Sequence, residues 1–410
     1  MIMVQRRLVP ALLIAAMLAV TTPVWSAQAP KARTSFNQWV KDFRPRALAR
    51  GISAATYARV TEKLQPDMTV FEKVDAQPEF QEQLWQYLNR RVSEWRINVG
   101  REKRKEHAAL LERIEKDFGV PPSVLLGLWG IESGYGDPLV QKNHMRPVFP
   151  ALAALAWGEP RRRDFWQQQL LFAFVIVERG WSTPGEMNGS WAGAMGHTQW
   201  MPEVWVNVGI DFDRDGRVSP FGAPDDALGS SARYLVQRGG YRRDEHWGYE
   251  VRLPAGFVVT SASRSYSNWE KAGVRRADGQ RFPQPKATAK LWVPAKGGPA
   301  FLLGPNFYAV RTYNPSNNYT LAILHLADRI AGGGPFVQAF PGGERAPTLA
   351  ELQEVQRRLT ALGYDTGGTD GRVGTGTMQA VQKFQKANGI KPADGYAGVT
   401  LLERLREMGR

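Results

Sequence analysis

Apolar side chains recur at intervals of three and four residues along most of this chain, the spacing that places them on one face of an α-helix. The pattern is clearest between residues 36 and 119, and it returns over residues 165–177 and 319–330. Residues 251–312 differ, because short alternating runs broken by Gly and Pro are typical of short strands. The sequence therefore predicts a mainly α fold of the α+β type, with a helical N-terminal region and a small β-containing insertion.

The N-terminus has the layout of a secretory signal peptide. Arg6 and Arg7 precede an unbroken apolar run over residues 11–20, and small residues follow around Ser26. The alternative is a membrane anchor, but a helix that spans a bilayer needs about 20 apolar residues. We expect residues 1–26 to be cleaved, which predicts an exported, soluble, periplasmic protein without stable membrane insertion.

The composition of this chain of 410 residues excludes several kinds of site and partner. The lack of Cys excludes disulfides, thiolate zinc sites, Cys nucleophiles and a lipid-modified N-terminal Cys. An excess of 53 Lys and Arg over 39 Asp and Glu gives a net charge of +14, which favours an acidic partner. Export argues against nucleic acid as that partner. Five His without paired spacing argue against a zinc hydrolase or amidase.

One carboxyl group is expected on an apolar helix face. Leu125, Leu128, Trp129 and Glu132 follow the spacing i, i+3, i+4 and i+7, and Gly134 ends the helix directly afterwards. Apolar neighbours disfavour the charged form and raise the pKa of a Glu from about 4.3 to about 6. Such a group can protonate the leaving oxygen of a glycosidic bond. The alternative is a structural Glu paired with an Arg.

The residues around Glu132 resemble the catalytic motif of lytic murein transglycosylases of the transglycosylase B family. The first matching block is Trp-Gly-Ile-Glu-Ser-Gly-Tyr-Gly over residues 129–136, and the second spans residues 190–202. Tyr313 and Asn314 followed by Tyr319 form a third block, and Gln-Pro-Glu-Phe at 77–80 with Tyr87 downstream forms a fourth. The blocks occur in family order between about residues 36 and 334.

The resemblance implies a lysozyme-like catalytic core that acts on peptidoglycan glycan strands. Glu132 would be the single general acid/base, cleaving the β-1,4 bond from MurNAc to GlcNAc and leaving 1,6-anhydroMurNAc ends without a cofactor. The residues that the resemblance places along the glycan cleft are Tyr87, Ser190, Gln199, Tyr234, Tyr313, Asn314 and Tyr319. The alternatives are a hydrolytic muramidase, or a non-catalytic wall-binding or scaffolding protein. Tight packing of the 190–202 block and core packing of each Tyr also stay open.

A second motif has the spacing of a calcium-binding loop. Asp211, Asp213 and Asp215 stand at the first, third and fifth positions, and Gly at the sixth permits the sharp turn. Gly222 occupies the twelfth position, where a bidentate Glu is usual. The resemblance supplies a delayed acidic ligand, which matches Asp226. We expect a structural Ca²⁺ at Asp211, Asp213, Asp215 and Asp226; a metal-free surface turn is the alternative.

The C-terminal part is expected to be a separate small unit. Residues 335–347 are rich in Gly and Pro and predict a flexible linker between a catalytic domain over residues 33–334 and a module over residues 348–410. Three apolar stripes separated by Asp-Gly pairs at 370–371 and 394–395 predict three short helices. This unit resembles the peptidoglycan-binding type 1 module, which would tether the enzyme to the wall. A purely structural mini-domain is the alternative.

Overall fold

The computed structural model describes residues 34–75, 82–137 and 145–408. The expected signal peptide over residues 1–26 and the motif over residues 77–80 lie outside the described residues. In the part of the chain that the structure describes, no helix combines the length and the hydrophobicity that crossing a bilayer requires.

Helices dominate the described chain up to about residue 240. In chain order they are α1 (Phe36–Ala49), α2 (Ala54–Thr61), α3 (Val70–Asp75), α4 (Leu84–Arg91), α5 (Glu94–Glu106), α6 (Ala108–Phe118), α7 (Pro122–Ser133), α9 (Val148–Gly158), α10 (Arg163–Glu178), α11 (Pro202–Asn207) and α12 (Asp225–Gln237). The short strands β1 (Arg146–Pro147) and β2 (Asn188–Gly189) pair in antiparallel fashion. The prediction of a mainly α fold is confirmed.

The core forms where α7 packs against α15 (Asn317–Ile330). Because α7 is buried on nearly every side, its backbone must approach its neighbours closely. Gly127 permits this, since a Cβ there would lie only 2.5 Å from the carbonyl oxygen of Ile323. The helix begins at Pro122 and ends before Gly134, whose φ of 61° is the left-handed conformation that favours glycine.

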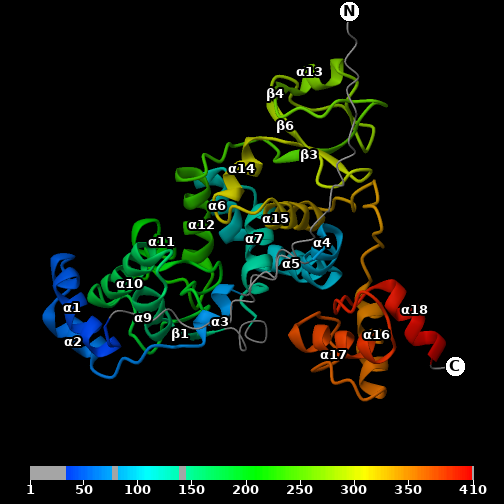
Figure 1. Cartoon of the computed structure of the whole chain (residues 1–410). Helices are drawn as coiled ribbons and strands as arrows, with labels where there is room; N and C mark the ends of the chain where they lie inside the picture. The colour runs from blue at the N-terminus through cyan, green and yellow to red at the C-terminus, as the bar shows by residue number, and fades with distance from the viewer. Residues whose placement is uncertain (1–33, 76–81, 138–144, 409–410) are drawn as a thin grey trace, which may run out of the picture.

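Another group of helices forms a second core beside this one. A second hydrophobic cluster joins α1, α2, α9, α10 and α11, and it includes a stacked pair of Tyr57 and Phe174 with ring centroids 5.1 Å apart. Figure 1 shows α1 and α2 at the far end of this group, beyond α9 and α10.

The predicted β-containing insertion is confirmed. Within the described residues, a five-stranded antiparallel sheet has the order β4 (Ser263–Ser265), β6 (Thr288–Trp292), β7 (Ala300–Leu303), β3 (Gly248–Arg252) and β5 (Arg275–Arg276). The same part of the chain contains the helices α13 (Tyr266–Lys271) and α14 (Pro305–Arg311). Leu291 pairs with Leu302, and Val251 pairs with Ala300. Figure 1 shows the sheet at the end of the molecule beyond α14 and α15.

The segment expected to be a flexible linker follows the surface of the molecule. Phe336 stacks on the buried ring of His325, with centroids 3.8 Å apart. The backbone amides of Val337 and Gln338 donate to the carboxylate of Glu250, at 2.7 and 2.8 Å. Side chains distant in sequence therefore contact a segment that is rich in Gly and Pro, and its flexibility stays a prediction.

The C-terminal module consists of α16 (Leu349–Ala361), α17 (Thr375–Ala387) and α18 (Val399–Met408), as the apolar stripes predict. Leu359, Val381, Phe384 and Leu402 form the centre of its core. The first helix begins with a capping box, in which the side chains of Thr348 and Glu351 each accept a backbone N–H of the other.

The contact of α7 with α15 predicts that Gly127→Val destabilises the fold. The added side chain overlaps the Ile323 carbonyl, and overpacking of this kind costs about 1–3 kcal/mol. Thermal unfolding followed by circular dichroism measures the effect as a lower Tm. Gly185→Val is the control, because nothing lies within 4 Å of a Cβ built there. An unchanged Tm for Gly127→Val would contradict this close packing of the two helices.

Candidate active site

Glu132 lies in the last turn of α7, and Leu125, Leu128 and Trp129 are buried on the same face of the helix. The carboxyl group is partly buried. The hydroxyl of Tyr319, in the first turn of α15, donates a hydrogen bond to Oε1 of Glu132. The predicted position of Glu132 on an apolar face is therefore confirmed.

Burial raises the pKa of Glu132 to about 7. The hydrogen bond from Tyr319 and the positive charge of Arg91 act in the opposite direction, because both favour the ionised carboxylate. At neutral pH the group therefore holds its proton roughly half of the time, which suits a residue that first donates and then accepts a proton. Among the described residues no Arg or Lys lies within ion-pair distance of Glu132, although the charge of Arg91 acts on its pKa.

The structure brings the predicted tyrosines together around this carboxyl group. Tyr319 and Tyr313 are close enough for Glu132 to contribute to the upward shift of both their pKa values, although burial contributes more. Tyr87 is buried in α4 and acts on Tyr319 in the same way. Tyr234 meets Tyr313 edge to face, with ring centroids 5.0 Å apart. These contacts link the four tyrosines in one cluster that includes Glu132.

The hydroxyls of two of these tyrosines are already engaged. Tyr313 donates to the carbonyl of Thr198 at 2.7 Å, and Tyr234 donates to the carbonyl of Thr312 at 3.0 Å. Both bonds hold ring positions, so the alternative of core packing describes part of what these side chains do.

Ser190, Gln199 and Asn314 do not hydrogen-bond to Glu132. Each bonds to nearby backbone: Ser190 Oγ accepts from the amide of Ala194 at 3.1 Å, and Gln199 Nε2 donates to the carbonyl of Gly196 at 3.0 Å. Asn314 Oδ1 accepts from the amide of Ser316 at 3.2 Å, just before α15. These bonds fix the loops that flank Glu132.

His197 joins the 190–202 block to the end of α7. Its Nδ1 accepts a hydrogen bond from Trp129 Nε1 at 3.1 Å, and its Nε2 donates to the carbonyl of Gly222 at 2.8 Å. Burial lowers the pKa of His197, so the ring is neutral with its proton on Nε2. Ser133 Oγ donates to the His197 carbonyl at 2.6 Å. No motif or spacing in the sequence indicates this bridge.

Arginines near α4 are functional candidates that the sequence analysis missed. Arg91 lies with its guanidinium 5.1 Å from the ring centre of Tyr87, and its Nε is buried without a hydrogen-bond partner among the described residues. Arg96 Nε donates to the carbonyl of Gly130 in α7 at 3.1 Å, and burial lowers the pKa of Arg96 to about 10. Helical spacing alone could not show that these two charges approach α7.

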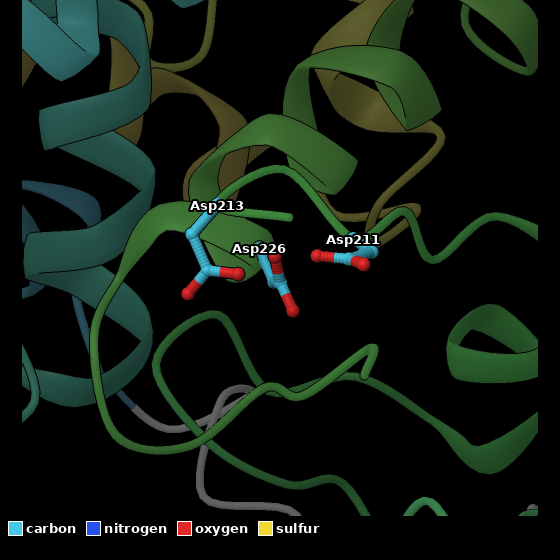
Figure 2. Close-up of side chains that lie close together, drawn as sticks. All are labelled: Asp211, Asp213 and Asp226. Atoms are coloured by element: carbon cyan, nitrogen blue, oxygen red, sulfur yellow. The ribbon is translucent and has the colours of Figure 1, made fainter. Parts of the chain in front are cut away.

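The acidic loop brings three of its four predicted ligands together. Oxygen atoms of Asp211, Asp213 and Asp226 lie within 4.8 Å of one another. Figure 2 shows the carboxylate of Asp211 directed toward that of Asp226, with Asp213 alongside. Asp215 is not part of the cluster, and its Oδ1 accepts the amide of Arg217 at 2.8 Å instead.

The chemistry of this cluster fits a hard cation. Burial and the neighbouring carboxylates raise the pKa of Asp213 and of Asp226. Crowded oxygen donors of this kind are the ligands that Ca²⁺ prefers. Asp226 also accepts the amides of Phe212 and Ser219, at 2.6 and 2.8 Å, so its position is fixed from both ends of the loop.

The same loop reaches toward Glu132. The carbonyl of Pro220 accepts the amide of His197 at 3.0 Å, and Gly222 accepts the His197 ring. Since His197 in turn holds Trp129, the acidic loop supports α7 through one intervening side chain.

Comparison with known proteins agrees with this fold. Residues 35–328 match the family described as the transglycosylase SLT domain, and residues 348–405 match that described as a putative peptidoglycan binding domain. Membrane-bound lytic murein transglycosylase B of Escherichia coli (strain K12) is 29% identical over 226 residues, 54% of this chain and 60% of that protein. The match therefore spans less than two thirds of that relative.

Solved structures extend the likeness over both parts of the chain. SltB3 from Pseudomonas aeruginosa in complex with NAG-anhNAM-pentapeptide has a TM-score of 0.71 and 39% identity, covering 91% of this chain and 100% of that chain. Escherichia coli lytic transglycosylase Slt35 in complex with calcium has a TM-score of 0.60 and 24% identity, covering 72% of this chain and 92% of that chain. These likenesses confirm the predicted lysozyme-like fold.

The position of Arg91 predicts that Arg91→Met raises the pKa of Glu132 above about 7, because a positive charge that favours the carboxylate is removed. NMR titration of the Glu132 side-chain carbon measures the midpoint. Arg90→Met is the matched control, since Arg90 pairs with Glu82 and does not act on Glu132. A lower or unchanged midpoint in Arg91→Met would contradict this electrostatic role of Arg91.

Proposed function

The chain belongs to the transglycosylase SLT family, and from that membership and the state of Glu132 we propose that it is a lytic transglycosylase acting on peptidoglycan. It cleaves the β-1,4 bond between MurNAc and GlcNAc and leaves 1,6-anhydroMurNAc ends. The observation that carries the proposal is the placement of the Glu132 carboxyl group on the apolar face of α7, bonded to the hydroxyl of Tyr319.

The reaction needs one group that acts twice. Protonated Glu132 gives its proton to the oxygen of the glycosidic bond, which breaks and leaves positive charge at C1 of MurNAc. The N-acetyl group of the substrate stabilises that charge. The Glu132 carboxylate then takes the proton of the C6 hydroxyl of the same sugar, and the C6 oxygen closes on C1. Because this nucleophile belongs to the substrate, its effective concentration is high and no water is required.

The surroundings of Glu132 favour this route over hydrolysis. Hydrolytic glycosidases use a second carboxylate about 5–9.5 Å from the first. Among the described residues no other carboxylate hydrogen-bonds to Glu132 or contributes to its pKa. The Tyr319 hydroxyl stabilises the carboxylate after the first proton transfer, and burial stabilises the acid before it.

The flanking residues position the glycan strand. Tyr87, Tyr234, Tyr313 and Tyr319 are proposed to line the path of the glycan, with the hydroxyls of the last three engaged by protein groups. Ser190, Gln199 and Asn314 offer polar atoms from loops that their own backbone bonds hold in place. The relative SltB3 was solved with a NAG-anhNAM-pentapeptide, which is the class of product that this reaction yields.

The proposed setting is the periplasm. A signal peptide over residues 1–26 exports the chain, a catalytic domain spans residues 33–334, and a linker over residues 335–347 leads to a peptidoglycan-binding module over residues 348–410. Cleavage of residues 1–26 removes Arg6 and Arg7, so the net charge falls from +14 to +12, and this positive charge complements the carboxylates of the peptide stems.

The acidic loop is proposed to hold a structural Ca²⁺ between Asp211, Asp213 and Asp226. The ion would neutralise the mutual repulsion of these carboxylates and fix the loop that supports His197. It takes no part in the chemistry at Glu132. Slt35, a relative that shares the fold, was solved in complex with calcium.

Glu132→Gln is expected to abolish turnover, a loss of about 10²–10⁴-fold or more, because the amide neither donates nor accepts the proton. Mass spectrometry of products released from sacculi measures it. Wild-type products with anhydro ends support the proposal, whereas reducing ends would indicate a muramidase and no release would indicate a non-catalytic wall-binding protein. Full activity of Glu132→Gln would remove the basis of the mechanism.

The thermal stability of Glu132→Gln shows whether the variant still folds. The pKa of Glu132 is raised from 4.5 to about 7 in the folded state, so its contribution to stability is lost as the pH rises between these two values, and the full penalty applies at pH 8. Glu132→Gln is therefore expected to unfold at pH 8 at a temperature no lower than that of the wild type. Glu102→Gln, on the exposed face of α5, controls for the substitution itself.

Calcium is expected to raise the Tm of the wild type and to bind at millimolar concentration or below, because an ion held only by the folded state stabilises it. Asp226→Asn should lose this response. Asp225→Asn is the matched control, since the neighbouring Asp225 pairs with Arg113 and lies outside the cluster. Equilibrium dialysis without uptake of Ca²⁺ would contradict the site.

A further inference from the structure

The C-terminal module makes direct contacts with helix α4 of the catalytic region. The side chain of Tyr396 meets α4 twice: its hydroxyl accepts a hydrogen bond from Asn89 Nδ2 at 2.9 Å, and its ring lies edge to face with Trp85, with centroids 5.0 Å apart. Gln86 Nε2 donates to Asp394 Oδ2 at 2.7 Å. Figure 1 shows α16, α17 and α18 on the same side of the molecule as α4 and α5.

A second contact lies beside the end of α7. The guanidinium of Arg372 is 3.0 Å from the carboxylate of Asp137 and 4.4 Å from the ring centre of Trp95 in α5. The exposed fractions of the two charged side chains are only 17% and 26%, so water screens this pair less than an exposed one. Asp137 follows Glu132 by five residues.

The two contacts come from equivalent turns within the module. Gly371 N and Gly395 N donate to the buried side-chain oxygens of Gln356 and Gln385, at 2.7 and 2.8 Å. In each turn the preceding Asp also accepts a hydrogen bond from the same Gln side chain. The module therefore repeats one unit, an Asp-Gly turn locked by a buried Gln.

This repeat gives Arg372 and Tyr396 the same position, directly after the Asp-Gly pair. In each turn the Asp side chain also accepts the backbone amide of that following residue, at 2.9 and 3.0 Å. Each of these side chains then contacts one tryptophan of the catalytic region, Trp95 or Trp85. A matched pair of rigidly held side chains is what a fixed docking contact requires.

The helix that receives the module also borders the active site. Tyr87 and Arg91 in α4 act on Tyr319 and Glu132, whereas Trp85, Gln86 and Asn89 of the same helix contact the module. One helix therefore contacts both the module and the groups around Glu132.

We propose that Arg372 and Tyr396 dock the module on α4 and on the turn after α7, so that it positions the active site in addition to binding the wall. Both are positioning residues, because they reach Glu132 only through α4 and Asp137. The inference rests on the proposed function for its kinetic test, but not for its structural test.

The structural test uses spin labels. Because the chain has no Cys, Glu102→Cys and Lys386→Cys place labels only on exposed sites of α5 and α17. The proposal expects a narrow distance distribution in the otherwise wild-type chain and a broad one after Arg372→Ala and Tyr396→Ala are added. A broad distribution without those two changes would overturn the docking.

The kinetic test compares substrates. On a soluble glycan of two GlcNAc-MurNAc repeats, which is too short to profit from a tether, the double variant should lose about tenfold in kcat, because misplaced groups react slowly. Arg372→Lys and Tyr396→Phe should each recover part of it. Arg404→Ala, an exposed pair partner of Glu407 in the same module, is the control.

The outcomes separate the two proposals. If the wild type cleaves the short glycan and the double variant has the same kcat on it, with loss only on whole sacculi, the module is a tether and the positioning role is overturned. If the wild type cleaves neither substrate, the proposed function fails, and the label distances still decide whether the module is docked.

Discussion

The chemistry proposed for this structure depends on burying one carboxyl group in the last turn of α7. Burial raises the pKa of Glu132 to about 7, and the Tyr319 hydroxyl and the charge of Arg91 limit that rise. If burial acted alone, the group would keep its proton and could not act as a base; with too many donors it would lose the proton and could not act as an acid. The balance needs α4, α7 and α15 at fixed separations.

Small residues set those separations. Gly127 allows the backbone of α15 to approach α7, and Gly130 leaves room for the hydroxyl of Tyr135, which would lie 2.6 Å from an added Cβ. The same hydroxyl donates to the carbonyl of Arg96 at 2.7 Å, and Arg96 returns a bond to Gly130. The helix is therefore held by polar contacts at its end and by close packing along its length.

The local parts of this arrangement were predictable and the long-range parts were not. Spacing of Leu125, Leu128 and Glu132 was enough to place the carboxyl group on an apolar face, and acidic spacing found Asp211 and Asp213. No periodic pattern records which loops approach across the fold. The bridge through His197, the charge of Arg91, the exclusion of Asp215 and the anchoring of residues 335–347 therefore emerged only from the structure.

The supports of α7 converge from four separate parts of the chain. The acidic loop holds His197, which holds Trp129; α15 supplies Tyr319; α5 supplies Arg96; and the module reaches Asp137 through Arg372. None of these groups needs to touch a sugar to matter. A carboxyl group whose pKa depends on burial changes its chemistry whenever a neighbouring element moves and admits water. Distributed support is therefore the physical condition for the proposed role of Glu132 as both acid and base.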